Sequence, residues 1–190
     1  MPENKCFSTL QAMKYCQGTP VTPGIKRRAF YASVSDVVKW PTIPRDEYGH
    51  PSSAKYEGNF VLAEGVKWLP VDHLANKAEF KSEVQGEEPS RTFKVTSTLV
   101  HPKVDENAAY ASTSLLNTRV VALVEDMTGK FRVIGCEQYD GALVSPARDN
   151  GQGATGTAGT TLTLEADDLV DAPFYEGEIV TEDGTINGAD

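Results

Sequence analysis

The residues from Arg91 to Cys136 constrain the fold most strongly, because they hold three strand patterns around one helical pattern. In residues 91–100 apolar and polar side chains alternate, which is typical of a strand with one buried face. The side chains expected on the buried face are Phe93, Val95, Ser97 and Leu99. His101-Pro102 ends this strand, since proline cannot donate a hydrogen bond to a neighbouring strand.

The period changes from two to that of a helix in residues 103–117. Ala108 and Leu115 fall on one helical stripe, which we expect to pack on a sheet. Asn117 is suited to the left-handed conformation that commonly follows a helix. The sequence therefore predicts one helix inserted between strands.

Two further strands follow this helix directly. Residues 119–126 and 130–136 are rich in Val, Ile and Phe, and Gly129 lies in the short connection between them. Glycine adopts the positive φ that tight hairpins require. We expect an antiparallel hairpin here.

A second and longer hairpin is predicted from Lys77 to Val100. Residues 78–84 alternate like residues 91–100, and Gly86 to Ser90 form a turn-rich tip. One face of this hairpin is apolar and the other is polar. The polar face holds Glu79, Lys81, Glu83, Lys94, Thr96 and Thr98.

The remainder of the chain reads as further strands and loops. A first strand is predicted over residues 25–34, and a hairpin is predicted from residues 59–63 and 66–70 around Glu64-Gly65, with Trp68 buried. Later strands are predicted at 141–145, where Pro146 should end the strand, at 160–165 and at 172–180. We predict a mainly β fold: an antiparallel β-sandwich or incomplete barrel with one flanking α-helix, long loops and an N-terminal arm.

The chain reads as one β-rich domain with an extension at each end. Residues 1–24 are polar and proline-containing and are interpreted as an arm, residues 25–180 as the domain, and residues 181–190 as a polar tail. The long segment Pro41 to Gly58 lacks periodicity and is expected to form a loop. No apolar run long enough to span a membrane and no secretory signal pattern is present in the sequence, which favours use without export.

Charge is distributed unevenly along the 190 residues. Residues 1–136 hold 17 basic and 15 acidic side chains, a net charge of +2, and residues 137–190 hold 1 basic and 12 acidic, a net charge of −11. Such an acidic segment repels a nucleic-acid backbone. It is also what an ordinary solvated, solubilising surface looks like.

No pattern of catalytic or metal-binding residues stands out. Ser52-Ser53-Ala54-Lys55 has the Ser-x-x-Lys spacing of acylating serine enzymes but lies in a proline-rich loop, without the companion motifs. The three histidines are widely spaced and are expected in turns or at the surface, and the acidic run Asp167, Asp168 and Asp171 lacks the loop pattern of a calcium site. The three cysteines fit reduced thiols better than a disulfide framework. We expect a protein that is not an enzyme and has no cofactor or metal.

Several segments resemble tail tube proteins of long-tailed bacteriophages, in the version found in phages and prophages of gut bacteria. The resemblance covers about residues 40–180, and the first 24 residues lie outside it. The matching segments are Phe60–Trp68, Ser82–Glu87, Leu99–Pro102 before the helix, Arg132–Tyr139, Ala158–Leu164 and Asp171–Tyr175.

The resemblance implies a virion structural protein that is assembled in the host bacterial cytoplasm. Copies would form rings, of six in this family, that stack into a tube through which DNA passes without specific binding, in contact with other tail or connector proteins and with no membrane. If the chain forms such rings, the polar face of the hairpin 77–100 is the best candidate for the channel wall. A capsid decoration protein, a head–tail connector and a non-viral β-sandwich binding module remain alternative interpretations.

Overall fold

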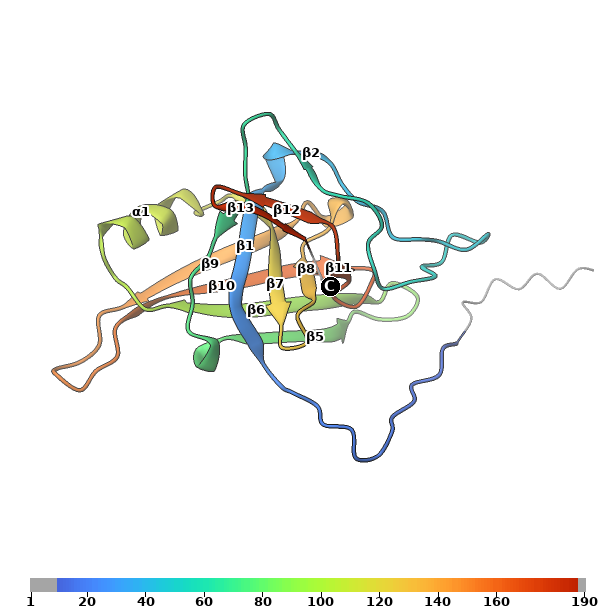
Figure 1. The fold of residues 1–190 in the computed structure, drawn as a ribbon, viewed down its shortest axis with the longest axis horizontal. Helices are drawn as coiled ribbons and strands as arrows, with labels where there is room; N and C mark the ends of the chain where they lie inside the picture. Colours follow the sequence, from blue (N-terminus) through green and yellow to red (C-terminus); the bar gives the residue numbers. More distant parts are fainter. Residues whose placement is uncertain (1–9, 188–190) are drawn as a thin grey trace, which may run out of the picture.

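The computed structural model describes residues 10–187, which form a mainly β protein with one flanking α-helix, as predicted (Figure 1). The strands are β1 (Ile25–Ser33), β2 (Val37–Lys39), β3 (Val61–Leu62), β4 (Leu69–Pro70), β5 (Glu79–Gln85), β6 (Thr92–His101), β7 (Arg119–Asp126), β8 (Phe131–Ile134), β9 (Ala142–Asp149), β10 (Gly159–Asp168), β11 (Phe174–Tyr175), β12 (Glu178–Thr181) and β13 (Gly184–Asn187), and the helix is α1 (Glu106–Ser114). Short 3₁₀ turns lie at Val34–Asp36, Ala75–Lys77 and Glu137–Tyr139.

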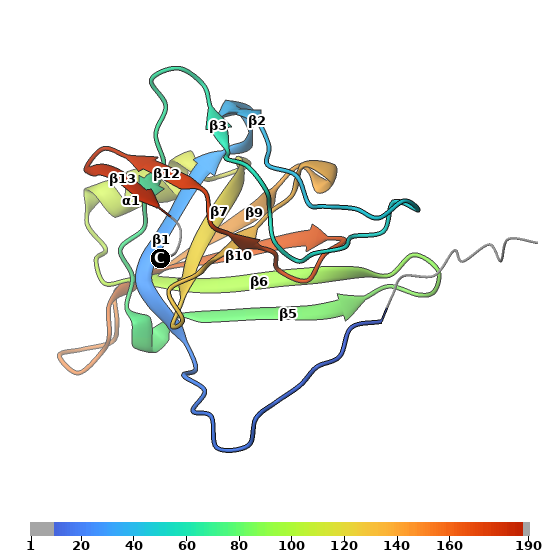
Figure 2. The ribbon, with the colours of Figure 1, turned by 45° about the vertical axis from the view of Figure 1, so that its right-hand side comes forward.

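Strand β7 is the centre of the main sheet, and all pairings in this sheet are antiparallel. It pairs with β1 and β8, and its first two residues pair with β9. We call β4, β1, β7, β8 and β11 the central segment of the sheet, and β9, β10, β6 and β5 the long segment. Figure 2 shows the long segment crossing β1 and β7 steeply, so that the sheet folds over on itself as an incomplete barrel.

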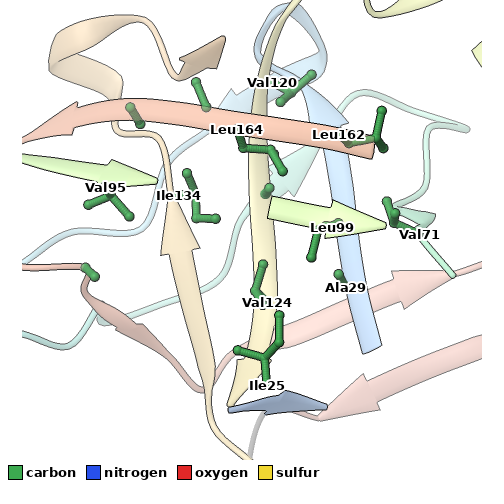
Figure 3. Packing of buried hydrophobic residues seen from close by; sticks show 14 of the residues in the cluster. Ile25, Ala29, Val71, Val95, Leu99, Val120, Val124, Ile134, Leu162 and Leu164 are labelled. Carbon is green, nitrogen blue, oxygen red and sulfur yellow. The ribbon is translucent and has the colours of Figure 1, made fainter. Parts of the chain in front are cut away.

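The first core fills the space between the two segments. Figure 3 shows side chains of the long segment beside side chains of the central segment: Val95 lies next to Ile134, and Leu99 lies next to Ala29. Val95, Ser97 and Leu99 are all buried, as the alternation predicts, while Phe93 near the hairpin tip is half-buried. Burying each such aliphatic side chain stabilises the fold by about 1.5–3 kcal/mol before entropy is counted.

A second core lies on the opposite face of β1, β7 and β8. It is rich in aromatic residues: Phe60 packs edge-on against both Trp68 and Trp40, with ring centroids 5.4 Å apart in each pair. The β12–β13 hairpin covers this core through the fully buried Ile179. Strand β7 is consequently buried on both faces from Val120 to Glu125, which explains why its sequence is continuously apolar rather than alternating.

Helix α1 is shorter than the predicted 103–117 and lies at the edge of the molecule. Asp105 caps it by accepting a hydrogen bond from the Ala108 N–H at 2.9 Å, and Asn117 has the predicted positive φ, at 60°. Leu115, just after the helix, is 3% exposed, whereas Ala108 is only half-buried. A cleft of about 290 Å³ separates the helix body from the sheet, so the predicted stripe is anchored by Leu115 alone.

The predicted hairpin around Glu64-Gly65 is wrong. Strand β3 pairs with β2, and β4 pairs with β1. Trp68 is buried in the second core, and its backbone N–H donates to the Val180 carbonyl at 3.0 Å. This burial directs the two short segments to different partners.

Two predicted ends also differ from the structure. Strand β9 continues through Pro146 to Asp149, because beyond Leu143 it has a neighbour on one side only and the missing N–H costs no ladder bond there. Residues 181–187 belong to the β12–β13 hairpin instead of a tail; residues 188–190 lie outside the described part. At the other end, residues 10–24 contain neither helix nor strand and are exposed.

Candidate functional site

The six polar residues singled out from the sequence lie together on one outward face. The register of β5 and β6 sets Glu79 opposite Thr98, Lys81 opposite Thr96, and Glu83 opposite Lys94. Side chains alternate across a strand, and the intervening Val95, Ser97 and Leu99 point into the core. The face is therefore continuous across the predicted hairpin.

Strand β10 extends this face with residues that the sequence reasoning did not assign to it. Thr163, Glu165 and Asp167 lie opposite Thr98, Thr96 and Lys94 of β6, and β9 adds Ser145 beside Thr163. We call the outward surface of β5, β6, β10 and β9 the polar face. The alternation of residues 160–165 was a usable signal for the orientation of β10, but not for its position beside β6.

Each lysine on the polar face has a carboxylate partner. Lys81 Nζ lies 2.8 Å from Glu79, and Lys94 Nζ lies 3.2 Å from Glu165. The hydrogen bond to Glu79 and the attraction of that carboxylate raise the pKa of Lys81 above its ordinary value, with a further contribution from Glu83. The partner of Lys94 lies on β10, outside the predicted hairpin.

The polar face carries net negative charge. On β5, β6 and β10, Glu79, Glu83, Glu165 and Asp167 supply four carboxylates against the two ammonium groups of the lysines, a net charge of −2. Gln85 Nε2 also donates to Asp167 at 2.5 Å, which ties β5 to β10 over β6. Threonine and serine side chains occupy the uncharged positions named above, so the face is hydrated.

The long segment ends in two unpaired edges within the described residues. Strand β5 pairs only with β6, and β9 pairs only with β10 beyond Leu143. Unpaired N–H and C=O groups along such edges are ready to pair with another strand. Val84 on β5 is 58% exposed on the core side of the hairpin, which leaves apolar surface uncovered beside this edge.

A buried ion pair fixes β1 to β7. The Glu125 side chain has no exposed surface, and Lys26 Nζ lies 2.9 Å from it, while Arg28 contacts both carboxylate oxygens. Burial on its own would raise the pKa of Glu125, but hydrogen bonds from Arg28 and Lys26 hold this pKa below its ordinary value. An acid at the end of an apolar run was the one feature of the sequence that pointed to this cluster.

The described residues contain no group of three or more His, Cys, Asp or Glu side chains arranged to hold a metal ion. Lys55 of the Ser-x-x-Lys sequence pairs with Glu176. Cys16 is exposed and Cys136 is buried, both as free thiols, and Cys6 lies outside the described residues.

One histidine departs from the expected surface position. His73 is 4% exposed, with Nδ1 3.0 Å from the Val71 carbonyl and Nε2 2.9 Å from the Lys26 carbonyl. Both ring nitrogens of His73 thus face a backbone carbonyl oxygen at hydrogen-bonding distance. His73 thereby joins β1 to the segment after β4 and serves the fold.

Comparison of the chain with protein-family models, with curated proteins and with solved structures gives no match. Among the described residues, no helix has the length and apolar character needed to cross a membrane.

Proposed function

We propose that the chain is a phage tail tube protein whose copies form stacked rings, of six copies each, around a channel for DNA. The observation that carries the proposal is the polar face, a four-stranded surface with net negative charge lying between two unpaired edges. The segments that resemble tail tube proteins supply the phage context.

Ring formation follows from the edges. When β5 of one copy lies beside β9 of the next, the unpaired backbone groups of both strands are satisfied and the long segments join into one sheet. A head-to-tail contact of this kind closes into a ring when its rotation divides a full turn. In such a ring the polar face lines the channel.

The charge of the polar face suits the passage of DNA. Protein cations that neutralise phosphates release counterions, and this release drives non-specific binding. Lys81 and Lys94 are already paired with Glu79 and Glu165, and the unpaired carboxylate of Glu83 repels phosphates. Such a wall lets DNA slide without holding it.

Contacts between rings are assigned to the arm and to the long loop. Residues 10–24 expose apolar side chains that no other described residue covers: Leu10, Met13, Tyr15 and Val21. Tyr48 in the loop 41–58 is also 48% exposed. An assembled neighbour would bury these side chains.

Electron microscopy of the purified protein tests the proposal. Tubes with an open central channel support it, and a map of those tubes must place Glu79 and Glu83 on the channel wall. Isolated rings would identify a head–tail connector instead, and a chain that stays monomeric and binds a ligand would identify a binding module.

A further inference from the structure

A cleft of about 310 Å³ lies at the end of β10, away from the polar face. Its walls include Trp40, Ile43 and Tyr56 from the segment after β2, and Cys136, Asp168 and Val170 from the opposite side. Trp40 is half-buried and Tyr56 is 7% exposed. The cleft is thus built from two aromatic rings, aliphatic surface and one buried carboxylic acid.

The carboxylate of Asp168 is only half satisfied. The residue is 5% exposed, and its Oδ1 accepts a hydrogen bond from the Val170 N–H at 3.0 Å. Its Oδ2 is buried and has no hydrogen-bond partner among the described residues. A buried carboxylate oxygen without a partner is costly, because burial removes the water that would stabilise its charge.

The groups around this oxygen do not neutralise its charge. Burial raises the pKa of the Cys136 thiol to about 11, and the charge of Asp168 adds to that effect, so the thiol stays neutral and donates to the Asp167 carbonyl at 3.4 Å. Glu137 contributes a second carboxylate to the lining. Arg45 also lines the cleft, but its Nη1 donates to the Gly49 carbonyl at 2.8 Å, so this guanidinium is engaged within its own loop.

We propose that this cleft binds an alkylammonium or guanidinium group, with Asp168 Oδ2 as its counter-ion and the rings of Trp40 and Tyr56 as its walls. A cation supplies the donor that Oδ2 lacks, and aromatic faces attract cations within about 6 Å of the ring centre. The aliphatic stem of such a group fits against Ile43 and Val170. A free organic amine carries this chemistry, and so does a lysine or arginine side chain of a second copy.

The first experiment titrates the isolated protein with n-butylammonium chloride at constant ionic strength and follows the backbone NMR signals of residues 168–170. Saturable shifts with n-butylammonium and none with n-butanol, its neutral analogue, are expected. Asp168→Asn should weaken binding about tenfold or more, as loss of a desolvated charge partner does. Asp171→Asn is the matched control: it removes the same charge from an exposed position three residues away and should bind like the unchanged protein.

A thermal measurement separates loss of the site from loss of the fold. Because burial raises the pKa of Asp168 and destabilises its ionised form, Asp168→Asn should raise the melting temperature of the unliganded protein while abolishing the further rise that n-butylammonium causes. Equal binding by Asp168→Asn, or equal shifts with n-butanol, would overturn the proposal.

Sedimentation distinguishes the two sources of the cation. If a side chain of a second copy occupies the cleft, saturating n-butylammonium and Asp168→Asn both reduce self-association. If a free amine is the ligand, both leave self-association unchanged while the NMR shifts persist. The proposal concerns this cleft alone, so it stands or falls independently of tube formation.

Discussion

Arg28 makes a bidentate contact with the carboxylate of Glu125: its Nη2 lies 2.7 Å from one oxygen, and its Nε donates to the other. Glu125 has no exposed side-chain surface, whereas the Arg28 side chain is half exposed. The pair joins neighbouring strands β1 and β7 beside the irregularity between Ile25 and Ala29. A buried acid is tolerated here because Lys26 and Arg28 satisfy it from the solvent side.

Replacing Glu125 with Gln should lower the free energy of unfolding at pH 7 by about 1.5–3 kcal/mol, the value of hydrogen bonds to a charged group. The pKa of Glu125 is lowered in the folded state, so its contribution is present above the unfolded pKa and is lost as the pH falls through the folded value. Denaturant unfolding should therefore show a difference between the two proteins that shrinks below about pH 4.5. A difference that stays constant down to pH 2 would contradict this account.

Leu115 and Leu116 offer a matched pair of substitutions. Leu115 is 3% exposed and Leu116 is 65% exposed. Leu115→Ala should cost about 2–5 kcal/mol of stability, as core truncations do, and Leu116→Ala should change it by less than about 0.5 kcal/mol. Equilibrium unfolding measures both, and equal effects would show that the helix is not anchored through Leu115.

The charge of the polar face should determine how strongly assembled tubes retain DNA. Changing Glu79 and Glu83 together to Lys should permit ring formation, because both side chains point away from the core, but should cause DNA to be retained in a salt-sensitive manner. Filter binding over a range of salt concentrations measures this retention. Glu64 and Glu182, which are exposed and lie outside both the polar face and the loop 41–58, make the same change of charge as a control. Tight binding of double-stranded DNA by the unchanged assembly at physiological salt would contradict the proposal that DNA passes through the channel without being held.

Limited proteolysis should report the contacts made by the arm and the loop 41–58. Trypsin is expected to cut after Lys14 and Arg45 in dilute monomer, since both residues are exposed. The same sites should be protected in assembled material. Near its end the loop is tied to β11, where the Tyr56 N–H donates to the Phe174 carbonyl at 2.9 Å and the Phe174 N–H donates to the Ala54 carbonyl at 2.8 Å. Equal cleavage of monomer and assembly would exclude these segments from the contacts between copies.

Local hairpins were predictable from the sequence, whereas distant pairings were not. The β5–β6 and β7–β8 hairpins join neighbours in the chain, so the alternation and Gly129 were sufficient signals. The position of β10 beside β6 depends on contacts between residues 59 to 75 apart in the chain, and Glu165 was missed on the polar face for that reason. The hairpin at Glu64-Gly65 failed because burial of Trp68 outweighed the local turn signal.

The sequence contained a signal for the cleft at Asp168, but it was interpreted only in terms of calcium binding. The alternation of Leu162 and Leu164 continues to Ala166 and Asp168, which places an acid at an inward position of β10. Sequence reasoning considered this acid only as a calcium ligand. What the cleft holds opposite it, Trp40 and Tyr56, comes from a loop without periodicity and could not be placed from the sequence.

The β12–β13 hairpin completes the second core only after the other parts of that core have been synthesised. The second core is built from β1, the segment around Phe60 and Trp68, and β7, all made before the hairpin that covers them. While a ribosome is still adding residues 178–187, this aromatic surface stays open to water and to chaperones. Until the β12–β13 hairpin forms, Ile179 is missing from the second core, so burial of this aromatic surface depends on the hairpin being complete.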